Sequence, residues 1–70
     1  MTVRTIIADD ELLARKKVCR FLGNHPDFVL VAECSSGTEA LAKIQECRPH
    51  LAFLDIRMPG LTGLEVLGNL

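Results

Sequence analysis

Three short apolar runs alternate along the chain with segments whose apolar residues recur at helical spacing. The apolar runs cover residues 3–8, 28–32 and 51–54, and they predict strands. Strands that alternate with helices in this way predict an α/β fold with a parallel sheet. Right-handed crossovers and short connections favour the strand order 2-1-3, with the first strand in the centre.

Local signals predict where the helices begin and end. Ser36 followed by Glu39 predicts a capping box at the start of the second helix, near residue 37, and Pro49 prevents that helix from continuing. Thr62 and Glu65 predict a second capping box, which begins the third helix. The helical segments are therefore delimited by capping chemistry as well as by periodicity.

The first helix, predicted at residues 11–22, carries an apolar face and a basic face. Glu11 stands four residues before Arg15, which predicts a stabilising pair within the helix. The third strand lacks polar alternation, which predicts burial on both of its faces. The predicted apolar face of the first helix consists of Ala14, Val18, Phe21 and Leu22.

Composition limits the class of protein. Seventy residues allow one small domain, and a net charge of −1 gives no reason to expect nucleic acid as a direct partner. The three cysteines form no CxxC pair, which predicts reduced thiols in a cytoplasmic protein. No stretch is long and apolar enough for a signal peptide or a membrane span, so no membrane association is predicted.

Three aspartates follow two of the predicted strands. Asp9 and Asp10 come directly after the first strand, and Asp55 comes directly after the third. Parallel strands all open their carboxyl ends on one edge of the sheet, so the three carboxylates should converge there. A single aspartate at such a position is usually a turn or cap residue. Three hard oxygen ligands together predict a site for Mg²⁺.

These residues resemble the receiver domains of two-component response regulators. The resemblance lies in the acidic pair Asp9-Asp10, in LDIRMPG at residues 54–60 and in LTGLEVL at residues 61–67. The opening Asp9-Asp10-Glu11 and residues 55–60 look most like receivers attached to LytTR-type DNA-binding domains. The resemblance implies a partial doubly wound (flavodoxin-like) parallel sheet over residues 1–70, which would be the N-terminal part of a receiver, truncated after the third βα unit.

The resemblance also implies roles for individual residues. Asp55 would accept a phosphoryl group from a sensor histidine kinase or a small phosphodonor. Asp9, Asp10, Asp55 and the backbone carbonyl of Arg57 would hold Mg²⁺. The chain would act as a phosphoacceptor signalling module and not as an enzyme. Control of transcription, and contact with DNA, would require an output domain that residues 1–70 do not include.

Full receivers have five strands, with a Ser or Thr after the fourth and a Lys after the fifth. Neither position exists in this sequence, so we expect it to phosphorylate poorly and not to switch. The third strand would lack its outer neighbour, and an unprotected apolar edge invites pairing with another chain. We therefore expect self-association through that edge.

Two alternatives remain open. One is a receiver-like module that mediates interaction or dimerisation independently of phosphorylation. The other is a phosphatase with an aspartyl nucleophile, although haloacid-dehalogenase-type enzymes place a second Asp where this chain has Arg57. A nucleotide-binding domain is disfavoured, because the turn after the first strand lacks the glycines that a diphosphate requires.

Overall fold

Strands and helices alternate strictly in the computed structural model, which describes residues 1–70. The elements are β1 (Val3–Ala8), α1 (Leu12–Gly23), β2 (Phe28–Cys34), α2 (Gly37–Cys47), β3 (Leu51–Leu54) and α3 (Gly63–Gly68). The three strands are all parallel, in the order β2-β1-β3, so the predicted α/β class and strand order are confirmed. None of the helices has the length and hydrophobicity of a membrane span.

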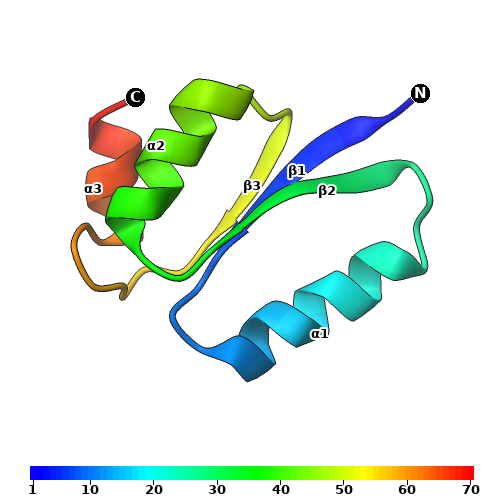
Figure 1. The fold of residues 1–70 in the computed structure, drawn as a ribbon, viewed down its shortest axis with the longest axis horizontal. Coiled ribbons are helices and arrows are strands. Elements are labelled where there is room, and N and C mark those ends of the chain that lie inside the picture. The colour runs from blue at the N-terminus through cyan, green and yellow to red at the C-terminus, as the bar shows by residue number, and fades with distance from the viewer.

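The central strand β1 is covered on both faces. Figure 1 shows α1 on one side of the sheet and α2 with α3 on the other. Successive side chains of a strand point to opposite faces, so Ile6 and Ala8 enter the core beneath α2 and α3, whereas Ile7 faces α1. All three are at most 1% exposed. The main core cluster consists of Ile6, Ala8, Cys34, Ala40, Met58 and Val66.

The register brings the carboxyl ends of all three strands to one level. Ala8, the last residue of β1, pairs with Cys34 on β2 and with Leu54 on β3. The sequence pattern predicts an end of β2 at Ala32, but the strand continues to Cys34 because its last two residues pair with the end of β1. Residues 9 and 55 therefore leave the sheet side by side.

Capping is confirmed at α3 and only half correct at α2. At α3, the Thr62 hydroxyl accepts from the Glu65 amide at 3.2 Å, and the Glu65 carboxylate accepts from the Thr62 amide at 3.0 Å. At α2, Ser36 accepts from the Glu39 amide at 3.1 Å as predicted. The Glu39 carboxylate, however, accepts from the Ser35 amide at 2.8 Å and not from Ser36. The Glu39 side chain thus stabilises the turn before α2.

Two predictions of burial are wrong. Phe21 is 51% exposed and packs against His25 with ring centroids 4.5 Å apart. Leu22 is the residue of this helix end that enters the core. Strand β3 is only half buried, and Leu51 is 36% exposed. The reason is that β3 is an edge strand with β1 as its only partner. The apolar run therefore predicted the position of β3 correctly but not how deeply the strand is buried.

Two helices begin against the backbone of another segment, and each contact requires a glycine. A Cβ on Gly37 would overlap the carbonyl of Leu61, and a Cβ on Gly63 would overlap the carbonyl of Asp55. The Gly37 amide also donates to the Pro59 carbonyl at 3.0 Å. These contacts pack the starts of α2 and α3 onto the chain that follows β3.

Stability at alkaline pH should depend on Cys34, which is 1% exposed at the end of β2. Burial, and to a smaller extent the Glu39 carboxylate, raises the pKa of its thiol from 9.0 to about 11. Between these two values the unfolded chain loses the proton and the folded chain keeps it. The free energy of unfolding should therefore fall by up to about 1.4 kcal/mol per pH unit above pH 9.

The measurement is urea denaturation at pH 8, 9 and 10, on the unmodified chain and on Cys34→Ala. The alanine variant should be less stable at pH 8 because a buried side chain is truncated, but its stability should decline less with pH. Equal declines in the two chains would contradict the prediction.

Candidate metal centre

The carboxyl edge of the sheet carries the three aspartates that the sequence singles out. Asp9 and Asp10 begin the turn from β1 to α1, and Asp55 begins the turn after β3. Backbone bonds extend the strand pairing into these turns. The Asp9 amide donates to the Cys34 carbonyl at 3.0 Å, and the Asp55 amide donates to the Ala8 carbonyl at 2.9 Å. The sheet itself therefore sets the relative positions of Asp9 and Asp55.

An amide of its own turn contacts one oxygen of each half-buried carboxylate. The Glu11 amide donates to Oδ1 of Asp9 at 2.9 Å. The Arg57 amide points to Oδ1 of Asp55 at 3.4 Å, a long and weak contact. Asp10 is exposed and makes no such bond. Each aspartate can consequently present at least one oxygen to a ligand.

The three carboxylates converge as predicted. Asp9, Asp10 and Asp55 each offer one oxygen, and these atoms all lie within 4.8 Å of one another. Neither of the two ion pairs in the structure involves them, so no basic side chain is paired directly with these carboxylates. Three negatively charged oxygens at this separation favour a divalent cation with a preference for hard oxygen ligands. The residues present therefore fit Mg²⁺.

An open cavity adjoins the acidic cluster. It measures about 170 Å³ and extends from the cluster into the gap between α1 and β3. Its polar wall is formed by the two half-buried aspartates, Asp9 and Asp55, and its apolar wall by Ile7, Ala8, Val18, Phe53 and Leu54. The acidic site is therefore reachable from solvent and partly walled by apolar side chains.

Arg15 is a residue of this region whose partners the sequence pattern does not predict. Arg15 was expected to pair with Glu11 on its own helix, but its Nε donates to Oε1 of Glu33 at 2.8 Å. Its Nη1 donates to the carbonyl of Asp9 at 2.8 Å. Glu11 instead stands at the N-cap of α1 in an extended conformation. Glu33 lies within reach of Arg15 only because β2 extends to residue 34. The helical spacing of residues in α1 gives no indication of where β2 ends.

Known proteins of one family match this chain. Residues 5–70 match the response regulator receiver domain. The transcriptional regulatory protein BtsR of Escherichia coli is 41% identical over 68 residues, which cover 97% of this chain and 28% of that protein. The positive alginate biosynthesis regulatory protein of Pseudomonas aeruginosa is 44% identical over 69 residues, with the same two shares.

Solved structures agree with this match. The signal receiver domain of the response regulator NarL from Mycobacterium tuberculosis superimposes with a TM-score of 0.90 at 38% identity. The alignment covers 93% of this chain and 52% of that one. The chain thus spans less than a third of the curated relatives and about half of a solved receiver domain.

Proposed function

This chain belongs to the response regulator receiver domain family, and we propose that Asp55 is its phosphoryl acceptor within a two-component system. The observation that supports this role is the convergence of Asp9, Asp10 and Asp55 to within 4.8 Å at the ends of β1 and β3. Three carboxylates at the strand ends provide a nucleophile and ligands for a cation, which a cation-assisted phosphoryl transfer requires.

Phosphoryl transfer needs little covalent chemistry from the protein beyond position and charge. In the proposed step, an oxygen of Asp55 forms a bond to phosphorus while the bond between phosphorus and the donor breaks. The Arg57 amide makes a long contact of 3.4 Å to Oδ1 of Asp55. Asp9 and Asp10 would hold Mg²⁺ directly or through water, with Asp55 and the backbone carbonyl of Arg57 as further oxygen ligands. When bound, the cation neutralises charge on the transferring group.

The donor in this proposal is a phosphohistidine of a sensor histidine kinase, or a small phosphodonor. Transcription would be controlled through an output domain, and the name of BtsR as a transcriptional regulatory protein supports that role. The chain would be a stoichiometric phosphoacceptor and not an enzyme with a substrate of its own. We propose a cytoplasmic location for this role. Family membership does not favour an aspartyl phosphatase or a phosphorylation-independent interaction module.

The metal site can be tested by titrating Mg²⁺ into the chain and following backbone amide chemical shifts. Saturable shifts should be confined to the turns that contain residues 9, 10 and 55. Asp10→Asn should raise the dissociation constant at least about tenfold, since loss of a ligand should cost no less than loss of an outer-shell partner. Asp27→Asn is the matched control, because it removes one exposed carboxylate from the loop before β2. Equal affinities in the two variants, or no saturable shift in the unmodified chain, would contradict the site.

Self-association through the free edge of β3 is a further part of this proposal. Strand β3 pairs with β1 alone, so its outer backbone groups are available to another chain. Sedimentation velocity over a range of concentrations should show reversible oligomers. Leu51→Lys should weaken them, whereas Leu64→Lys changes an equally apolar exposed residue on α3 and should not. A compact monomer at high concentration would rule out this association.

A further inference from the structure

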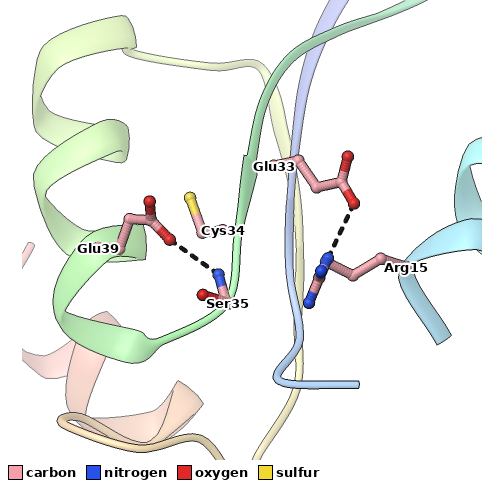
Figure 2. A pocket seen from close by; sticks show the side chains of 5 residues that line it. All are labelled: Arg15, Glu33, Cys34, Ser35 and Glu39. Carbon is pink, nitrogen blue, oxygen red and sulfur yellow. Dashed lines mark hydrogen bonds and ion pairs between the residues drawn. The ribbon is translucent and has the colours of Figure 1, made fainter. Parts of the chain in front are cut away.

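Arg15 connects three segments beside the acidic cluster. Its side chain extends from α1 to the end of β2 and to the turn after β1. Figure 2 shows the ion pair between Arg15 and Glu33, two of the residues that line a pocket. This pocket measures about 320 Å³. We propose that Arg15 is a positioning residue, which fixes the main chain of Asp9 so that its carboxylate faces the metal centre. This inference rests on the proposed function.

The guanidinium group is suited to this task by its geometry. Nε donates to Oε1 of Glu33 and Nη1 donates to the carbonyl of Asp9, both at 2.8 Å. The donors lie in one rigid plane, so Glu33 fixes the direction in which Nη1 points. The Arg15 side chain is only 16% exposed, although it carries a full charge. A surface arginine that merely contacts solvent would be neither so buried nor bonded twice.

With this bond, the main chain of Asp9 is held on both sides. Its amide donates to the Cys34 carbonyl at 3.0 Å, and its carbonyl accepts from Arg15. Rotation of the peptide that follows Asp9 would break the bond to Arg15. That rotation would also displace the Glu11 amide, which donates to Oδ1 of the Asp9 carboxylate at 2.9 Å. The orientation of the carboxylate therefore depends on a bond that its own segment does not supply.

Charge and position predict opposite effects of removing Arg15. A cation near a metal centre repels the metal, so loss of the guanidinium charge alone would strengthen Mg²⁺ binding. Loss of a group that orients a ligand weakens binding, typically tenfold to a hundredfold. A fall in affinity on removal of a positive charge would therefore identify the positioning effect.

The experiment measures Mg²⁺ affinity by amide chemical shifts for the unmodified chain, Arg15→Lys and Arg15→Gln. Arg15→Lys loses the planar fork of the guanidinium group. It keeps the charge and most of the apolar stem, and therefore it should preserve the fold. Both variants should raise the dissociation constant about tenfold, the lower end of the range for outer-shell partners. Arg20→Gln removes an exposed charge from the same helix and should leave the affinity unchanged or slightly higher.

A second readout does not require the metal. Amide hydrogen exchange without Mg²⁺ should become faster at Glu11 in both Arg15 variants and should stay unchanged at Ile6 in the centre of β1. A purely structural role would accelerate exchange at both amides. Unchanged exchange at Glu11, or an affinity for Mg²⁺ equal to or higher than that of the unmodified chain, would overturn the inference. If the unmodified chain takes up no Mg²⁺, the proposed metal site fails and the exchange at Glu11 alone decides the role of Arg15.

Discussion

Asp55→Asn should abolish acceptance of a phosphoryl group while leaving the fold intact. Asparagine has the shape of aspartate, and its amide oxygen can still accept from the Arg57 amide, so the turn after β3 keeps its geometry. The amide is neutral and a poor nucleophile, and therefore it forms no acyl phosphate. Incubation with acetyl phosphate and Mg²⁺, followed by intact mass measurement, should show a slowly formed phosphorylated species in the unmodified chain and none in the variant.

Two controls test whether the label is an acyl phosphate on Asp55. Asp27→Asn makes the same chemical change at an exposed aspartate in the loop before β2, and it should be labelled as well as the unmodified chain. Hydroxylamine should remove the label, since it cleaves acyl phosphates. Hydroxylamine-sensitive phosphate on Asp55→Asn would assign the acceptor to another residue.

Of the five possible glycine-to-alanine substitutions, Gly37→Ala should destabilise the chain most. The added Cβ would overlap the Leu61 carbonyl, which belongs to the backbone and cannot rotate away as a side chain could. Relief requires α2 to separate from the segment after β3, which also breaks the bond between the Gly37 amide and the Pro59 carbonyl. We expect a loss of about 3 kcal/mol or more in the free energy of unfolding. The total free energy of unfolding of a chain of this length is only about 4 to 10 kcal/mol.

Gly23→Ala is the matched control for this prediction. Gly23 is the last residue of α1, and a Cβ there would meet no atom within 4 Å. The same methyl group should therefore stabilise the chain by about 0.5 to 1 kcal/mol through helix propensity. Thermal and urea denaturation of the two variants should give shifts of opposite sign. A Gly37→Ala variant as stable as the unmodified chain would contradict the close contact.

The predictions that the structure confirms depend on strong local patterns. Strands β1 and β3 have the predicted bounds, and Asp9, Asp10 and Asp55 converge because parallel strands must end on the same edge. Thr62 and Glu65 sit within one helical turn, so a short sequence motif contains the whole capping interaction. In each case the information lies within a few residues or follows from the topology of the fold.

One error concerns a contact between segments that are distant in sequence, and two concern a choice between neighbouring positions. Arg15 lies 18 residues before its partner Glu33, and nothing in the first helix indicates that β2 extends that far. Phe21 has the correct helical spacing for a core residue, but its face turns toward His25 and solvent. The Ser36 capping box is wrong by one position because the Glu39 carboxylate binds the preceding amide. Periodicity predicts elements, whereas tertiary packing determines their partners.

The alignment of the three strand ends also has a consequence for the order of folding. Pairing of β1 with β2 brings together residues about 25 positions apart, whereas pairing of β1 with β3 joins Thr5 to Leu51, 46 positions apart. Closing the longer loop costs more entropy, so β3 should dock last. Asp9 and Asp10 are then already in place when Asp55 arrives. A partly folded chain has no assembled acidic centre, and competence for the proposed chemistry appears only with the final strand pairing.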